Sequence, residues 1–509
     1  MRTLVYGKYL IRGAGERRQI VKNGAACVEG SIIKDVGDFK VLSKSYQYDL
    51  KVGSEKHIVM PGLINSHDHG NGISLILRGI SDGPLETWVQ DFFYRGMEGW
   101  NTYDNVMLSC INQIENGVTC FINHYYSPFD LLDSNRHTED VESAVRACVD
   151  SGGRALFSPA FTNQNYCTYE DGSFLGTLPE GIRRSFNLSV ATESDKAERL
   201  KQYVSGFREL HRRYDGKDER IRVYLGPSNV HWVSDDAWLE IKKTANRLKT
   251  GIHTHLVETR YQAQYGTKFL GKTPAKHLDD LAILGPEVSC AHSIWLTRED
   301  ISILARTRAT AVHNPSSNLR LFNGIAPALE MKRAGMSVAI GLDGTTINDE
   351  QDMFQEMRLC SLLHRHPGIQ ARHLSSNEIL DMNLTGGSKV ALDEGGIGAI
   401  EIGRRADIIL VNASRFTVPF VSEKLPLIDL LILRAKGSDV DHVMINGNLV
   451  VRNRRFLMAN KSKLLQRVGK WKEKNSGLDQ NLAKLVDRIR SFYKRWDRGE
   501  PSNRMNFIS

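Results

Sequence analysis

Both ends of the chain contain short stretches in which apolar and polar residues alternate, the pattern of half-buried β-strands. These stretches lie at residues 3–6, 26–29, 30–37 and 58–60 near the start and at 406–411 and 440–451 near the end. In the last of them, Asn446-Gly447 is typical of a tight hairpin turn. We therefore expect a small β-sandwich domain formed jointly by residues 1–60 and 393–459.

The middle of the chain has a different pattern, in which apolar strand candidates alternate with helix-length segments such as 274–284 and 298–306. The eight strand candidates are the stretch that precedes His67 and residues 117–122, 154–158, 221–225, 250–255, 288–292, 309–313 and 336–341. Eight such units predict an α/β fold, a parallel (β/α)8 TIM-like barrel over residues 61–392. The active site of such a barrel lies at the carboxyl ends of its strands.

Two further segments differ from the barrel pattern. Residues 163–184 are rich in polar residues, glycine and aromatics and are long for a connecting loop, so we expect a lid there. In residues 460–509, apolar side chains recur at helical spacing, namely Leu478, Leu482, Leu485, Ile489, Phe492 and Trp496. This spacing predicts a basic amphipathic helical tail that packs on the body of the protein or on a partner subunit.

Composition narrows the class of protein. Of the 509 residues, 41% are apolar and 25% charged, as in ordinary globular proteins, and no apolar run approaches the ~18 residues of a membrane span. The net charge of +8 lies entirely in residues 460–509, which carry 13 basic and 5 acidic residues, so we expect neither a nucleic-acid nor a membrane partner. Seven scattered cysteines without a Cys-x-x-Cys pair predict reduced thiols and a cytoplasmic location.

The segment Pro-Gly-Leu-Ile-Asn-Ser-His-Asp-His (61–69) places two histidines one residue apart at the end of a strand candidate. Alternate side chains of a strand share one face, so His67 and His69 converge while Asp68 points elsewhere. Two converging imidazoles form half of a site for a borderline ion such as zinc. Other strand ends must supply the remaining ligands.

Three later strand ends carry residues that complete such a site. His253 and His255 share one strand face and are followed by Glu258, while His292 and Asp343 each end another strand candidate. Taken singly, each could be a hydrogen-bonded core residue, and for a lone histidine that is the better explanation. Their shared position at the ends of barrel strands favours one common site.

These motifs, in this order, resemble the amidohydrolase superfamily over about residues 20–455, in the branch that holds guanine, 8-oxoguanine and S-adenosylhomocysteine deaminases and triazine hydrolases. The matching motifs are Pro-Gly-Leu-Ile…His-x-His, Arg78-Gly79…Trp88, His255-Leu-Val-Glu-Thr, Ala291-His-Ser-Ile-Trp-Leu, His313-Asn-Pro-Ser-Ser-Asn-Leu-Arg-Leu, Gly341-Leu-Asp-Gly and Gly398…Gly403-Arg-Arg-Ala-Asp.

The resemblance implies one divalent metal ion per subunit, with zinc as the first candidate and iron as the second. Its implied ligands are His67, His69, His255 and Asp343. The family spacing His-x-x-Glu selects His255 rather than His253, which we expect to be a structural residue one pleat deeper. The fourth strand ends in Gly-Pro-Ser-Asn-Val (226–230) without the lysine of two-metal relatives, so we expect a mononuclear site.

The expected chemistry is addition of water to an electron-poor carbon, followed by loss of ammonia or another leaving group. Asp343 accepts a proton from the water that the metal activates. Glu258 protonates a ring nitrogen and then the leaving group, and His292 donates a hydrogen bond to the attacking oxygen.

Substrate contacts follow from the same resemblance. Trp88 matches an aromatic position near the pocket in relatives, although a core aromatic explains it equally well. The run Asn-His-Tyr-Tyr (123–126) is similar to the Asp-His-x-Tyr segment of 8-oxoguanine deaminases, with Asn123 in place of the aspartate. Glu98 falls one residue out of register with a substrate-contacting glutamate of nucleoside deaminases, and Ser228 stands where relatives often have a histidine. The expected substrate-binding residues are Trp88, Glu98, His124 and Tyr125.

We therefore predict a metal-dependent hydrolase that deaminates a small nitrogen heterocycle, purine-, pterin- or triazine-like. One alternative keeps the activation of water but cleaves another bond: an amide, carbamate, N-alkylamine or carbon–halide bond. A second alternative is a non-catalytic scaffold of the same fold, which predicts lost ligands, whereas all four implied ligands are present. The relatives imply that the protein assembles as a homo-oligomer.

Overall fold

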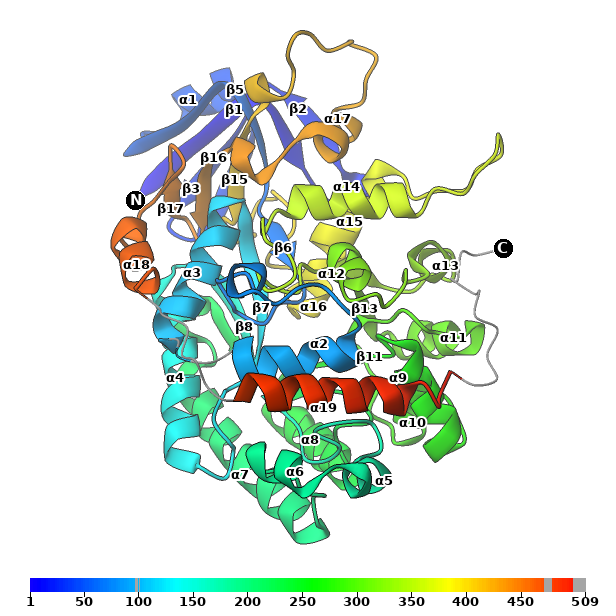
Figure 1. Cartoon of the computed structure of the whole chain (residues 1–509). Coiled ribbons are helices and arrows are strands. Elements are labelled where there is room, and N and C mark those ends of the chain that lie inside the picture. Colours follow the sequence, from blue (N-terminus) through cyan, green and yellow to red (C-terminus); the bar gives the residue numbers. More distant parts are fainter. Residues whose placement is uncertain (97–98, 100, 471–477, 498–509) are drawn as a thin grey trace.

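The computed structural model describes residues 1–96, 99, 101–470 and 478–497 (Figure 1). Its centre is a ring of short parallel strands in two sheets. The first holds β6 (Leu63–Asn65), β7 (Val118–Tyr125), β8 (Arg154–Phe161), β9 (Ile221–Val223) and β10 (Gly226–Pro227), and the second holds β11 (Ile252–Leu256), β12 (Val288–His292), β13 (Thr310–His313) and β14 (Val338–Ile340).

Two contacts join these sheets into a barrel. A parallel bridge links Leu225 to Ile252 on one side. On the other side the backbone N–H of Ser66 donates to the carbonyl of Ile340 at 3.1 Å. The predicted parallel barrel is confirmed, and its strands begin and end within a few residues of the expected positions because each is a fully buried apolar run.

Helices surround the barrel strands. They include α3 (Thr102–Glu115), α4 (Ser134–Asp150), α7 (Glu193–Tyr214), α8 (Asp235–Leu248), α10 (Pro274–Asp280), α11 (Arg298–Thr307), α13 (Ala328–Arg333) and α14 (Met353–Leu363). Local sequence fixes their starts: the Thr297 hydroxyl accepts from the N–H of Asp300, and the Asp300 carboxylate accepts from the N–H of Thr297, a capping box. Within the described part of the chain, no helix is long and apolar enough to cross a membrane.

Both ends of the chain contribute to one nine-stranded mixed sheet, at the top of Figure 1. The early strands are β1 (Arg2–Arg12), β2 (Gln19–Lys22), β3 (Gly24–Glu29), β4 (Ile32–Asp38) and β5 (Leu50–Pro61), and the late strands are β15 (Ile408–Asn412), β16 (Val440–Ile445), β17 (Asn448–Arg452) and β18 (Arg455–Phe456). β5 pairs with β1 in parallel and with β15 antiparallel, in the register Met60 to Ile409. The sheet thus joins the two chain ends, as predicted, while the domain boundaries stay predictions.

The tail contains α18 (Lys461–Val468) and α19 (Leu478–Tyr493), and α19 lies alongside α2 (Leu85–Asp91) (Figure 1). α19 also packs on the segment expected to form a lid, which contains α5 (Asp171–Phe174) and α6 (Glu180–Ser185). One apolar cluster unites them: Phe174, Leu178, Ile182, Leu482, Leu485, Ile489 and Phe492. Residues 471–477 and 498–509 of the predicted tail lie outside the described residues.

Candidate metal centre and active site

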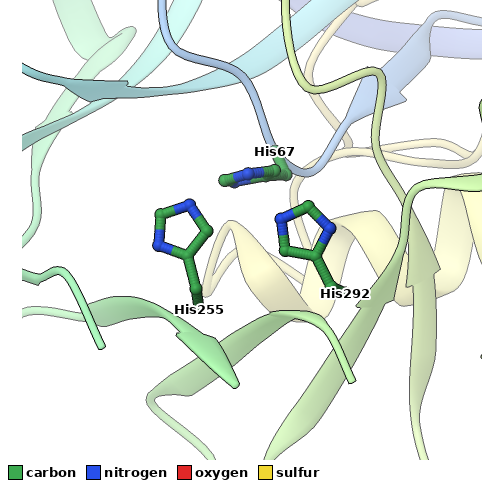
Figure 2. Close-up of side chains that lie close together, drawn as sticks. All are labelled: His67, His255 and His292. Carbon is green, nitrogen blue, oxygen red and sulfur yellow. The ribbon is translucent and has the colours of Figure 1, made fainter. Parts of the chain in front are cut away.

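Side chains from four barrel strands converge at one point at the barrel mouth. Nε2 of His67 and Nε2 of His69 each lie 3.0 Å from Oδ1 of Asp343. His67 also forms a group with His255 and His292 whose ligand atoms lie within 4.8 Å of one another (Figure 2). The structure therefore brings together all four residues expected to bind the metal, with His292 beside them.

The outer ring nitrogens of two of these histidines are engaged by backbone carbonyls. Nδ1 of His69 lies 2.7 Å from the carbonyl oxygen of His124, and Nδ1 of His255 lies 2.7 Å from that of Ser228. A carbonyl can only accept, so each Nδ1 carries the proton and each Nε2 keeps a lone pair directed into the cluster. This orientation by a second layer of acceptors is typical of histidines that bind metals.

His67 is oriented by His253, which is not one of the expected ligands. Its Nδ1 lies 2.7 Å from Nε2 of His253, and Nδ1 of His253 lies 2.7 Å from the hydroxyl of Ser289. His253 is therefore placed behind His67 rather than in the cluster, on the same strand as His255 and deeper in the barrel.

The cluster fits a bound cation. Nε2 of His67 and Oδ1 of Asp343 are buried and have no hydrogen-bond partner among the described residues. Two acceptor atoms that face each other at 3.0 Å repel unless a proton or a cation lies between them. Three imidazoles and one carboxylate are the ligand types that a borderline divalent ion prefers.

Electrostatics favour the metal-binding protonation state in three of the four expected ligands, whereas for His69 the opposing effect of burial is outweighed by Asp343, and its pKa is raised. Burial lowers the pKa of His67 and, further, that of His255, so both rings are neutral near pH 7. Burial opposes ionisation of Asp343, but the neighbouring rings of His67 and His292 hold its pKa well below the ordinary value. The Ser317 hydroxyl donates to Oδ2 of the same carboxylate.

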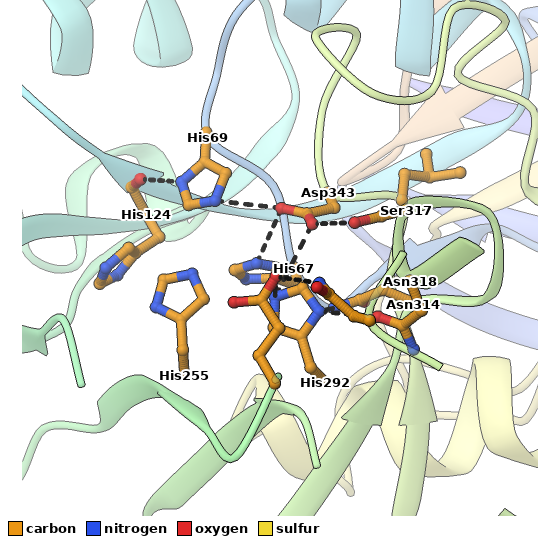
Figure 3. A network of polar contacts seen from close by, with 12 residues as sticks. His67, His69, His124, His255, His292, Asn314, Ser317, Asn318 and Asp343 are labelled. Atoms are coloured by element: carbon orange, nitrogen blue, oxygen red, sulfur yellow. Dashed lines mark hydrogen bonds and ion pairs between the residues drawn. The ribbon is translucent and has the colours of Figure 1, made fainter. Parts of the chain in front are cut away.

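His292 lies beside His67 and Asp343 (Figure 3), and Glu258 lies close to His292. Nε2 of His292 lies 3.7 Å from Oε1 of Glu258 and 3.7 Å from Oδ2 of Asp343. Asn323 donates to Oε1 of Glu258 at 2.7 Å. Burial, followed by the charge of Asp343, raises the pKa of Glu258 well above its ordinary value, while burial lowers the pKa of His292 to about 4.

The backbone at two of these strand ends adopts a left-handed conformation. His292 and Asp343 both have φ of +67°. This region is unfavourable for residues with a Cβ and persists mainly where the surrounding fold imposes it, often at functional sites. Here both residues belong to the group of side chains that meet at the barrel mouth.

Two neighbouring cavities lie at the site. The inner one, of about 50 Å³, is lined by His69, His255, Glu258, His292 and Asp343 together with aromatic residues. The outer one, of about 720 Å³, is lined by Glu86, Trp295, Asn318, Phe322, Asn323 and other residues. Leu321 lines both, so the two cavities adjoin at this residue.

The expected substrate-binding residues occupy different places. Trp88 lines the inner cavity. The ring of His124 packs against His255, with 5.0 Å between ring centroids. The hydroxyl of Tyr125 instead donates to Asp140 at 2.7 Å, away from the cluster, and Tyr126 lines the inner cavity in its place. Glu98 lies outside the described residues.

Sequence reasoning missed Glu86. Its Oε1 accepts hydrogen bonds from the hydroxyls of Thr259 at 2.6 Å and Tyr169 at 2.9 Å, and its side chain lines the outer cavity. Burial raises the pKa of Glu86. The sequence offered only a weak indication of this role. Glu86 is a single carboxylate two residues before Trp88, in a stretch that is otherwise apolar or neutral.

The tail helix is linked to this part of the site. The backbone N–H of Tyr169 donates to the hydroxyl oxygen of Tyr493 in α19 at 3.0 Å. Tyr169 in turn donates to Glu86, as described above. α19 and the 163–184 segment therefore fix one wall of the outer cavity.

Comparison with known proteins agrees with this geometry. The amidohydrolase family model matches residues 58–450. The chain is 30% identical, over 443 residues, to the 5-methylthioadenosine/S-adenosylhomocysteine deaminase of Caldanaerobacter subterraneus, covering 86% of this chain and 91% of the relative. It is 28% identical, over 427 residues, to the 5'-deoxyadenosine deaminase of Methanobrevibacter smithii, covering 83% and 87%.

Solved structures share the fold. A zinc-bound adenosine deaminase from Xanthomonas campestris matches with a TM-score of 0.75 at 22% identity, over 96% of this chain and 98% of the other. The zinc complex of atrazine chlorohydrolase from Arthrobacter aurescens matches with a TM-score of 0.73 at 21% identity, over 95% and 100%. The predicted fold and class, a hydrolase that deaminates a nitrogen heterocycle, are confirmed. The chain belongs to the amidohydrolase family.

Proposed function

We propose that the protein removes the exocyclic amino group of an adenine nucleoside by hydrolysis, with one zinc ion bound at His67, His69, His255 and Asp343. The names of the relatives support the substrate class, and the zinc in related structures supports the metal. The observation that carries the reaction type is the buried carboxyl of Glu258 beside the ligand cluster, with Nε2 of His292 3.7 Å from its Oε1.

Zinc at these ligands would supply Lewis acidity and lower the pKa of a water toward neutrality. Asp343, fixed by Ser317, accepts the proton that the water loses. Glu258 is protonated because burial raises its pKa, so it can donate to the ring nitrogen next to the carbon under attack. Once deprotonated, Glu258 takes up the proton of the hydroxyl group that has added to the ring and passes it to the departing amine, and the proton held by Asp343 restores the acid form of Glu258.

His292 stabilises the attacking oxygen. Nδ1 of His292 lies 2.9 Å from the amide oxygen of Asn318 and 3.3 Å from Nδ2 of Asn314. The Asn318 oxygen can only accept, so it favours a proton on Nδ1, whereas the carboxyl groups of Glu258 and Asp343 favour a proton on Nε2, which they face. In the tautomer with its proton on Nε2, the ring can donate a hydrogen bond to the oxygen as negative charge develops on it.

The outer cavity supports a nucleoside rather than a free base. Its volume of about 720 Å³ adds room for a sugar and a substituent beyond the heterocycle. Glu86 offers a carboxylate acceptor to sugar hydroxyls, while Trp295, Leu319 and Phe322 offer apolar surface to a substituent.

The test is ammonia release by the zinc-loaded protein over a panel of adenosine, 5'-deoxyadenosine, 5'-methylthioadenosine, S-adenosylhomocysteine, guanine and a chlorotriazine. We expect turnover of the adenine nucleosides above all others. Preferred turnover of guanine, or chloride release from the triazine, would contradict the proposed substrate class. The Asp343→Ala variant should lose both zinc and turnover, whereas Glu299→Gln, an exposed residue of α11, should retain both.

A further inference from the structure

A second cluster of metal-ligating side chains lies apart from the active-site cluster. His313 ends β13, Cys360 lies in α14, and His364 caps the carboxyl end of α14. The ligand atoms of these three residues all lie within 4.8 Å of one another. All three residues are buried, with Cys360 fully inaccessible to solvent.

Helical spacing explains how two ligands come from one element. Cys360 and His364 are four residues apart, so they project from the same face of α14. That face packs against the end of β13, which presents His313. The arrangement therefore joins a helix to a barrel strand through three side chains of ligand type.

The two rings are placed as they would be around one ion. Nε2 of His364 lies 3.1 Å from Nε2 of His313. Two nitrogens bound tetrahedrally to one zinc ion at ~2.0 Å would lie about 3.3 Å apart. Burial lowers the pKa of His313 and brings the pKa of His364 to about 4, so both rings are neutral and can offer lone pairs near pH 7.

The hydrogen bonding of the two rings is strained by a shortage of protons and partners. Two neutral rings that face each other through Nε2 share only one proton, so one Nε2 donates and the other accepts. An ion bound by both Nε2 atoms would take the place of that shared proton. Nδ1 of His313 is buried and has no hydrogen-bond partner among the described residues, so the ring is held chiefly through Nε2.

We propose that His313, Cys360 and His364 form a second metal site, specific for a thiolate-binding d10 cation, Zn²⁺ or Cu⁺. Sulfur together with two imidazoles is the ligand set that selects these ions over Mg²⁺ or Ca²⁺. On binding, Cys360 releases its thiol proton to solvent and the sulfur forms the metal bond, with no change of oxidation state. Three protein ligands complete a trigonal Cu⁺ site or leave one position of a tetrahedral Zn²⁺ site for water.

The second cluster lies close to the active site. Asn314 follows His313 directly, and its side chain lies 3.3 Å from Nδ1 of His292. The three residues of the second cluster do not line the inner cavity.

Cobalt provides a test that separates the two sites. The active-site ligands are nitrogen and oxygen atoms, whereas the second site contains a thiolate, so only the second site gives a sulfur-to-cobalt charge-transfer band. We expect that band when Co²⁺ is added to the metal-free protein, and we expect it to persist in Asp343→Ala. It should disappear in Cys360→Ala and weaken in His364→Gln, but persist in Cys27→Ala and in His373→Gln, which change a buried cysteine and an exposed histidine elsewhere.

A parallel titration with Cu⁺ identifies the ion. A cobalt band indicates a zinc-type site, and tight Cu⁺ binding that requires Cys360, without the cobalt band, indicates a copper(I) site. If the wild-type protein shows neither, the proposal is overturned without recourse to any variant. Loss of the band together with retained deamination would leave the proposed function intact, so the two proposals fail separately.

Discussion

Nε2 of His253 lies 2.7 Å from Nδ1 of His67, and through this contact a residue without access to the inner cavity fixes the orientation of an expected metal ligand. The hydroxyl of Ser289 holds His253 from behind. The cluster is thus supported by side chains deeper in the barrel as well as by the backbone carbonyls that hold His69 and His255.

Replacing His253 should weaken metal binding. In His253→Leu the Nδ1 atom of His67 loses its partner, and loss of such a contact lowers metal affinity by about 10- to 100-fold. The measurement is the free zinc concentration, set by a chelator, that gives half-maximal activity. His57→Leu, which removes a buried histidine from the mixed sheet, should leave that concentration unchanged. Equal zinc dependence of His253→Leu and the wild type would show that His253 only fills space.

Glu258→Gln should abolish proton transfer but keep the metal. The amide has nearly the shape of the acid and can still contact Asn323, but it has no acidic proton for the ring nitrogen. We expect kcat to fall by about 10²- to 10⁴-fold at unchanged zinc content. Glu299→Gln serves as the matched control. Turnover at the wild-type rate would exclude Glu258 as the proton donor.

Tyr493→Phe should affect substrate binding from the tail helix. The variant leaves the buried N–H of Tyr169 without an acceptor, at a cost of about 1–3 kcal/mol in the free energy of unfolding. Because Tyr169 also contacts Glu86, we expect KM to rise while kcat changes little. Tyr48→Phe, which removes a hydroxyl that donates to the Leu42 carbonyl in a distant part of the chain, should lower stability without raising KM. A rise in KM in both variants would refute a specific role for α19.

Glu356 should make stability depend on pH. This buried carboxyl of α14 accepts from the N–H of Ser316 at 2.8 Å, and burial raises its pKa to about 8 from an ordinary 4.5. Between pH 4.5 and about pH 8, Glu356 is ionised in the unfolded chain but stays protonated in the folded protein. Its stabilising contribution is complete below pH 4.5 and is lost as pH rises to 8, by up to about 1.4 kcal/mol per pH unit.

Denaturant unfolding of the wild type and of Glu356→Gln from pH 5 to 8 checks this prediction. The uncharged amide should remove the part of the slope that Glu356 causes, so the variant gains stability relative to the wild type as pH rises. Parallel stability curves for the two proteins would contradict the raised pKa. The stability of the control variant Glu299→Gln should change with pH in the same way as that of the wild type.

The sequence predicted the barrel and the metal cluster because both follow from local rules. Fully apolar runs mark buried parallel strands, and histidines or carboxylates at their carboxyl ends must meet at one mouth. His67 and His69 could be paired from strand alternation alone. The partner of His67, His253, was expected to be structural, and no pattern in the chain indicated its contact with Nδ1.

The substrate contacts were harder to predict. Alternation along β7 places His124 and Tyr126 on one face and Tyr125 on the other, and this rule would have favoured Tyr126 over Tyr125. Glu86 lines the outer cavity, and its helix α2 packs against α19. No local sequence pattern specifies this packing, because the two helices are far apart in the chain. The second cluster has the same origin, since His313 meets Cys360 and His364 only when α14 packs on β13.

The pairing of β5 with β15 has a consequence for how the protein acquires its fold. β5 leads through Pro61 directly into the strand that carries His67, while its antiparallel neighbour β15 is encoded after the whole barrel. Closing so long a loop loses chain entropy before any contact repays it, so such pairings form slowly. The last steps of refolding should therefore include both this pairing and the closure of the barrel between Ser66 and Ile340, and the segment around His67 should reach its final alignment only with them.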